Sequence, residues 1–140
     1  DSRVINMEKT NIRYMDTESF PEKIDLISID VSFISLHLIL PVAAALLSED
    51  GYIVCLVKPQ FEAGREQIGK GGIVRDKKIH HEVIQNVIGY AKESFLYPAG
   101  LTFSPVTGAK GNIEYLLLLS KKQNDQVLDI EQVIGETAHL

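Results

Sequence analysis

One apolar run, Tyr52-Ile-Val-Cys-Leu-Val57, constrains the fold of this chain more than any other feature. A strand this continuously hydrophobic is typical of a sheet that is covered on both faces. Asp25–Asp30 and Glu114–Ser120 have a similar β-rich character. Weaker strands are expected over Arg3–Met7 and around Ala99–Phe103. The chain is therefore expected to build a sheet from several short strands.

Helical patterns lie between these runs. Leu36–Leu47 is rich in alanine and leucine, with Glu49-Asp50-Gly51 as its stop signal and Pro41 in its first turn, where a missing N–H costs nothing. A second helix is expected from an N-cap at Asp76 to Phe95, with apolar residues at four-residue spacing. A short terminal helix is predicted over residues 126–136.

Strands that alternate with helices predict an α/β fold with a mainly parallel sheet. The end of the chain differs, because only about ten residues separate the strand near Thr102 from the strand near Glu114, too few for a crossover helix. The final pair is therefore expected to be antiparallel. This is the arrangement of a Rossmann-like methyltransferase fold, although a fold alone does not establish a function. The last expected strand ends near Ser120, and residues 122–140 are expected to form a C-terminal tail.

Composition excludes several classes of protein. The 140 residues are 45% hydrophobic and 24% charged, which rules out a wholly disordered chain. No apolar run reaches the roughly 18 residues of a membrane span. The single Cys55 excludes an internal disulfide framework, and the four histidines have no metal-ligand spacing with it. We therefore expect a soluble, cytoplasmic protein with no metal and no membrane partner.

The charge is unevenly distributed. The net charge is −5, yet residues 58–82 contain six basic and four acidic groups, with Arg65, Lys70 and Arg75 among the basic ones. This segment is interpreted either as a phosphate-contacting loop or as a solvated loop of mixed charge. Gly64–Gly71 fits the G-x-x-x-x-G-K pattern, but Gly71 stands where Ser or Thr should bind magnesium. A glycine-rich lid over a site and a plain surface loop both remain open.

Three charged residues lie at strand ends. Asp30 closes one strand, Lys58 follows the central apolar run, and Glu114 opens the last strand. Ligands bind at the carboxyl ends of parallel strands, and an antiparallel final strand begins at that same edge. The three side chains are therefore expected to converge, the alternative being that each only ends a strand and faces water.

Five segments of the chain, in this order, closely resemble the TlyA-type proteins. This family is also called hemolysin A-like and belongs to the FtsJ-like rRNA methyltransferases. The resemblance covers residues 1 to about 121, and the last twenty residues carry no recognisable signature. The segments are Met7–Arg13, Ile29–Leu36, Leu56–Arg65, Gly69–Asp76 and Gly111–Tyr115.

The resemblance implies methyl transfer from S-adenosylmethionine to a ribose 2′-hydroxyl of rRNA, with rRNA or a ribosomal subunit as the partner. It makes Asp30, Lys58 and Glu114 three members of a Lys-Asp-Lys-Glu catalytic set, with Lys58 as the proton acceptor. It also matches Asn11 to the position that approaches the adenine of the cofactor, and Asp30 is expected to contact the cofactor as well.

The chain departs from the family pattern in what it lacks. The resemblance implies an N-terminal RNA-binding domain, a first catalytic lysine and an Asp/Gly-rich cofactor loop, and this sequence contains none of them. We therefore expect a C-terminal part of a longer enzyme, inactive alone, whose exposed sheet edge stays open, pairs differently or forms a homodimer. The alternatives are a non-catalytic RNA- or ribosome-binding module and a hemolysin-like protein.

Overall fold

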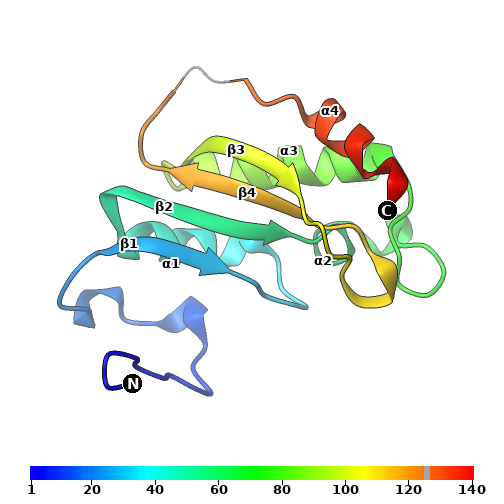
Figure 1. Ribbon diagram of the computed structural model, residues 1–140. Coiled ribbons are helices and arrows are strands. Elements are labelled where there is room, and N and C mark those ends of the chain that lie inside the picture. Colours follow the sequence, from blue (N-terminus) through cyan, green and yellow to red (C-terminus); the bar gives the residue numbers. More distant parts are fainter. Residues whose placement is uncertain (125–126) are drawn as a thin grey trace.

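The computed structural model describes residues 1–124 and 127–140, and its centre is a four-stranded sheet with the order β1-β2-β4-β3 (Figure 1). Strand β1 runs parallel to β2, whereas β4 runs antiparallel to both of its neighbours, β2 and β3. Three strands therefore share one direction and only β4 opposes them. This confirms the predicted α/β fold with its antiparallel final strand. The strands are β1 (Ile24–Ile29), β2 (Leu47–Val57), β3 (Tyr97–Phe103) and β4 (Tyr115–Ser120).

The two faces of the sheet are covered by helices to different extents. In Figure 1, α1 and α3 lie behind the sheet, while α4 lies beside β3 on the viewer's side. Short 3-10 helices complete the connections, at Ile12–Tyr14, Thr17–Ser19, Leu36–Leu38, Arg65–Gln67, Ala109–Gly111 and Glu136–His139. The α-helices are α1 (Leu40–Leu46), α2 (Pro59–Glu62), α3 (Lys77–Glu93) and α4 (Ile130–Gly135).

Local signals account for where the helices begin. Pro41 lies in the first turn of α1, as predicted. The Asp76 carboxylate accepts a hydrogen bond of 2.9 Å from the Lys78 N–H, so Asp76 is the N-cap of α3, also as predicted. The terminal helix expected over 126–136 is observed as α4, and residue 126 itself lies outside the described residues.

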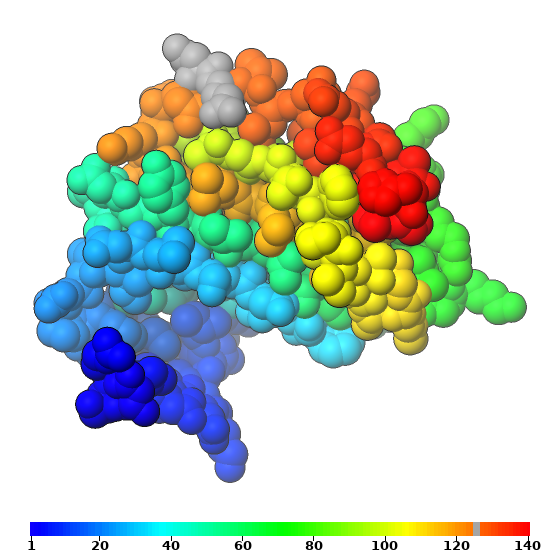
Figure 2. All heavy atoms as spheres, viewed as in Figure 1, coloured from blue at the N-terminus to red at the C-terminus, as the bar shows by residue number. Residues whose placement is uncertain are grey.

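The core lies between the sheet and the two helices behind it. Apolar side chains on one face of β2 and β4 pack against α1 and α3 and are shielded from solvent. The opposite face is covered only in part, since Leu26 and Tyr52 remain 67% and 46% exposed. Figure 2 shows strand side chains at the surface on this face. Fully buried members of the core are Leu40, Leu47, Ile53, Cys55, Val57, Ile84, Val87, Leu117 and Leu119.

The prediction of a strand over Arg3–Met7 is wrong. These residues form a turn and irregular chain, with Ile5 84% exposed, and Figure 2 shows the N-terminal segment projecting from the body. A strand needs a neighbour for its backbone hydrogen bonds, and this segment has none in the described part of the chain. Among the described residues, no strand pairs with the outer edge of β1. The homodimer through that edge stays a prediction.

The predicted stop at Glu49-Asp50-Gly51 also takes a different form. The helical region ends at Leu46, and β2 begins at once at Leu47. The residues between Leu47 and Tyr52 are accommodated by a register shift, since Ile24 pairs with Leu47 but Leu26 pairs with Tyr52. The turn signal is thus absorbed into an irregular start of β2.

Candidate active site

An ion pair joins the ends of β1 and β2. The Lys58 ammonium lies 2.5 Å from an Asp30 carboxylate oxygen and donates a hydrogen bond of 3.3 Å to the Ser32 hydroxyl. Because β1 and β2 are parallel neighbours, their carboxyl ends bring Asp30 and Lys58 to the same edge of the sheet. The Lys58 side chain is only 11% exposed, whereas that of Asp30 is 68% exposed. The pair therefore presents a carboxylate to solvent and holds the cation beneath it.

Glu114 lies at the same edge, one strand further along. The first residue of β4, Tyr115, pairs with the last residue of β2, Val57, so Glu114 and Lys58 flank the ends of paired strands. Glu114 is 7% exposed, and its carboxylate accepts a hydrogen bond of 2.8 Å from the Gln60 amide. The expected convergence thus takes two forms: Asp30 contacts Lys58 directly, and Glu114 contacts the segment that follows Lys58.

The turn before Glu114 is shaped around its carboxylate. A Cβ placed on Gly108 would lie 2.1 Å from a Glu114 carboxylate oxygen, so no other residue fits there without displacing that side chain. The Gly108 N–H donates a hydrogen bond of 2.7 Å to the Asn112 carbonyl, which closes the turn. The glycine therefore permits the backbone to approach Glu114.

A third carboxylate, which sequence reasoning missed, ties the two strand-end loops together. Glu62, at the end of α2, accepts hydrogen bonds of 2.7 Å from the Ser35 hydroxyl and 2.8 Å from the Leu36 N–H. Burial raises the pKa of Glu62, and these two hydrogen bonds oppose that rise. The segment after Lys58 thereby holds the segment after Asp30. No local pattern signals a contact between residues so distant in sequence.

Two aromatic rings adjoin the ion pair. Phe33 and Phe61 lie with ring centroids 4.7 Å apart, and the Lys58 ammonium lies 6.0 Å from the Phe61 centroid. Phe33 is 90% exposed and has a φ of 62°, a conformation that bulky residues rarely adopt. An apolar, solvent-facing ring is thus held beside the charged pair, and the sequence reasoning did not single it out.

A cavity of about 230 Å³ lies against β1. Its lining is mostly apolar and includes Ile12, Ile27, Asp30 and Val31. Asn11 immediately precedes this lining, and its side chain caps a 3-10 helix by accepting from the Arg13 N–H at 3.1 Å. The cavity suits the flat apolar ring of an adenosine, with Asp30 as a polar partner. It is smaller than the roughly 300–1,000 Å³ of a complete small-molecule site, so the described residues fit one end of S-adenosylmethionine only.

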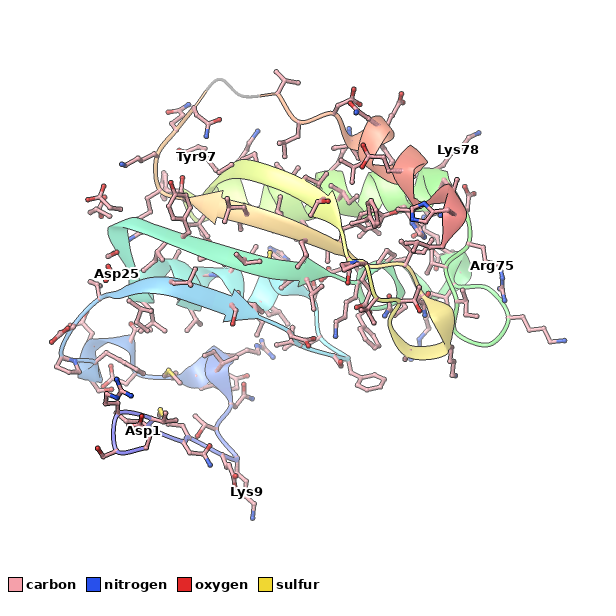
Figure 3. All side chains as sticks on the ribbon, in the orientation of Figure 1. Asp1, Lys9, Asp25, Arg75, Lys78 and Tyr97 are labelled. Atoms are coloured by element: carbon pink, nitrogen blue, oxygen red, sulfur yellow. The ribbon has the colours of Figure 1, made fainter. Side chains whose placement is uncertain are left out.

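The basic residues predicted to contact RNA lie near this edge. Arg75 donates a hydrogen bond of 3.2 Å to the Lys70 carbonyl, and Figure 3 shows Arg75 and Lys78 at the end of the molecule where β1 and β2 finish. Lys110, which sequence reasoning missed, lies close by, since a Cβ on Gly72 would be 3.6 Å from its ammonium. None of Arg65, Lys70, Arg75 and Lys110 forms an ion pair in residues 1–124 or 127–140. Their charge is available to an external anion.

The described residues form neither a metal centre nor a membrane-spanning helix. They contain no group of three or more His, Cys, Asp or Glu side chains arranged to hold a metal ion. No helix among them combines the length and the apolar character needed to cross a membrane.

The α/β sheet with its antiparallel β4 has the arrangement of the Rossmann-like methyltransferase fold. The chain belongs to the FtsJ-like methyltransferase family, whose model matches residues 1–121. This finding confirms the resemblance inferred from the sequence motifs.

Individual relatives agree with this assignment. The chain is 47% identical over 99% of its length to YqxC of Bacillus subtilis, provisionally named as an rRNA methyltransferase. It is 41% identical over 91% of its length to TlyA of Mycobacterium tuberculosis, named as a 16S/23S rRNA (cytidine-2′-O)-methyltransferase. A solved structure from Streptococcus thermophilus, provisionally titled a hemolysin, superposes with a TM-score of 0.90 at 48% identity over 97% of this chain and 50% of that chain.

The chain spans about half the length of the curated relatives it matches, 52% of YqxC and 47% of TlyA. The activity of those whole proteins is therefore a matter for proposal in this chain.

Proposed function

We propose that this chain carries the proton-handling part of an S-adenosylmethionine-dependent methyltransferase that acts on the ribose 2′-hydroxyl of rRNA in the cytoplasm. The observation that carries the proposal is the Asp30–Lys58 ion pair beside the buried Glu114. Family membership supports the methyltransferase class, and the names of the relatives support rRNA as the substrate. Asp30, Lys58 and Glu114, to which the family resemblance gives catalytic roles, also lie at one edge of the sheet.

The chemistry requires a base for the ribose hydroxyl proton. S-adenosylmethionine, when bound, supplies the methyl group that the ribose oxygen attacks. The Lys58 ammonium first releases a proton to solvent past the exposed Asp30 carboxylate, and the resulting neutral amine takes the hydroxyl proton as the ribose oxygen attacks. Asp30 with Ser32 fixes where that nitrogen lies. Glu114, oriented by the Gln60 amide, accepts a hydrogen bond from the ribose. The low exposure of Lys58 keeps bulk water away from the transferred proton.

The proposed cofactor contacts lie along β1. Asp30 and the apolar lining from Ile12 to Val31 hold the adenosine end, and Asn11 approaches the adenine edge. The exposed Phe33 ring beside Lys58 offers a stacking face to a base of the substrate. Arg65, Lys70 and Arg75 contact the phosphate backbone.

Methyl transfer by a chimera tests this proposal. In the chimera, this chain replaces the part of YqxC that it matches and is joined to the remainder of YqxC. The 47% identity over 99% of this chain defines where the two sequences are joined. The expected result is transfer of a radiolabelled methyl group from S-adenosylmethionine to bacterial rRNA, at a ribose 2′-oxygen identified by mass spectrometry. RNA binding without methylation would instead support the non-catalytic RNA-binding module, and lysis of erythrocytes without either would support the hemolysin-like alternative.

Replacing Arg65 and Lys70 with alanine in the chimera is expected to weaken substrate binding rather than chemistry. Each phosphate contact releases counterions from the RNA, so losing a contact weakens binding and raises the KM for rRNA. The slope of log affinity against log salt concentration is expected to fall by roughly one per residue. Cofactor affinity stays nearly unchanged. The control is Lys92→Ala with Lys122→Ala, which removes two exposed cations at the opposite edge of the sheet, one of them paired with Asp50. Equal salt slopes for both double variants would contradict a phosphate-contacting role.

A further inference from the structure

The glycine-rich loop from Gly69 to Asp76 is anchored to the rest of the molecule chiefly at Val74. Val74 is 2% exposed, and both of its peptide groups bond to side chains rather than to a neighbouring strand. Its N–H donates to the Asn112 side-chain oxygen at 3.1 Å, and its carbonyl accepts from the His80 Nε2 at 2.7 Å. A side chain from the turn before Glu114 and one from α3 therefore hold the two peptide groups on either side of Val74.

These contacts determine the tautomer of His80. The Val74 carbonyl can only accept, so Nε2 carries the proton and Nδ1 is free to accept. The Tyr115 hydroxyl lies 2.7 Å from Nδ1 and is the donor that completes the arrangement. Burial lowers the pKa of His80, which the Val74 hydrogen bond opposes and the nearby Lys77 reinforces. His80 is 1% exposed and is therefore held as a neutral ring with one donor and one acceptor, both engaged.

The residues that hold Val74 also flank Glu114. Asn112 precedes it by two positions and Tyr115 follows it directly. The Asn112 amide also donates to the Gly72 carbonyl at 3.0 Å and to the Ala109 carbonyl at 3.1 Å, so one side chain binds both loops. Tyr115 is fully buried at the start of β4. The position of Glu114 and that of the glycine-rich loop are thereby coupled.

The loop needs such an anchor. Gly71 and Gly72 have φ values of 79° and 78°, and residues with this freedom are costly to order. Three contacts link the loop to itself: the bridge between Gly69 and Ile73, a hydrogen bond of 3.1 Å from the Gly72 N–H to the Gly69 carbonyl, and the Arg75 contact to the Lys70 carbonyl. Without Val74 held in place, Lys70 and Arg75 would keep their charge but lose a defined position relative to Glu114.

We propose that His80 is a positioning residue that, together with Asn112 and through its bond to Tyr115, fixes the loop from Gly69 to Asp76 in register with Glu114. The anchor is a property of this chain alone, and only its purpose, alignment of an RNA-contacting loop with the reacting groups, rests on the proposed function. His80 touches neither the ion pair nor the cavity along β1, so it acts through Val74.

Hydrogen exchange in the 140-residue chain tests the anchor without any activity assay. His80→Phe keeps an aromatic ring but removes both hydrogen bonds, and Tyr115→Phe removes only the hydroxyl. Both are expected to speed exchange of the Gly72 and Val74 amides by about tenfold or more, while the Ile53 and Cys55 amides of β2 change far less. His80→Gln, whose amide can still donate to the Val74 carbonyl, is expected to restore part of the protection. Parallel changes in the loop and in β2, or an unchanged loop, would overturn the proposal.

Matched controls and a spectroscopic signature sharpen this test. His81→Phe and Tyr90→Phe alter the same helix, α3, away from Val74 and are expected to leave the loop amides as in the wild type. Nitrogen-15 shifts of the His80 ring are expected to show a protonated Nε2 and an unprotonated Nδ1. An Nδ1–H tautomer would overturn the assignment even if His80→Phe failed to fold. Because no readout involves methylation, loss of the proposed enzyme function would leave the outcome intact.

Discussion

Replacing Lys58 with alanine in the chimera is expected to lower methyl transfer by at least about a hundredfold, the lower range for loss of a general base. The substitution removes the nitrogen that takes the ribose proton and leaves the Asp30 carboxylate without its partner. Affinity for S-adenosylmethionine is expected to change little, because Lys58 does not line the cavity along β1. The rate of methyl transfer under single-turnover conditions measures the loss of chemistry. Titration with the cofactor measures its affinity separately.

Two further variants make this result specific. Lys92→Ala removes an exposed lysine at the far end of α3 and is expected to leave turnover unchanged. Lys58→Arg keeps a cation that can pair with Asp30 but cannot accept a proton, so it is expected to be as inactive as Lys58→Ala. If Lys58→Ala lost only a few-fold in turnover, or if Lys58→Arg were fully active, Lys58 would be an electrostatic contact instead of a base.

The 140-residue chain alone is expected to bind S-adenosylmethionine at least about a hundredfold more weakly than the chimera. In the proposed function, the cavity of about 230 Å³ holds only the adenosine end, and the sequence contains no match to the Asp/Gly-rich cofactor loop that the family resemblance implies. Hydrogen bonds to the charged methionine end are worth about 1.5–3 kcal/mol each, so the loss of two accounts for that factor. Asn11 cannot compensate, because it adjoins the cavity proposed for the adenosine end and a single amide cannot replace a loop at the methionine end.

Titration calorimetry of both proteins measures this difference. Adenosine serves as the matched ligand, since it lacks the methionine end and is expected to bind the chain and the chimera with similar affinity. Micromolar binding of S-adenosylmethionine to the chain alone would contradict the prediction. It would mean that the residues along β1 suffice for the whole cofactor.

The strand ends were predictable from the sequence because two simple rules act there. A continuous apolar run marks β2, and the direction of parallel strands then fixes Lys58 beside Asp30. The short connection before Glu114 fixes the direction of β4 in the same way. N-cap chemistry likewise placed the start of α3 at Asp76, since that signal lies within a few residues.

What the sequence did not reveal depends on contacts between distant segments. The Glu62 contact to Ser35 spans 27 positions, and the His80 contact to Tyr115 spans 35. Neither leaves a periodicity or spacing signal, because each follows from how the loops pack after the sheet has formed. The mistaken strand over Arg3–Met7 has the opposite cause: its local propensity is suitable, but a strand is stable only beside a partner.

The unpaired outer edge of β1 lies next to the charged site, because β1 ends one residue before Asp30. Neighbouring strands in a sheet lie about 4.8 Å apart. If a further strand paired in parallel with this edge and ended level with β1, the residue directly after that strand would lie close to Asp30. Extending the sheet would therefore place one further side chain beside the Asp30–Lys58 pair, so a separate polypeptide that supplied one strand would also supply a neighbour for the site.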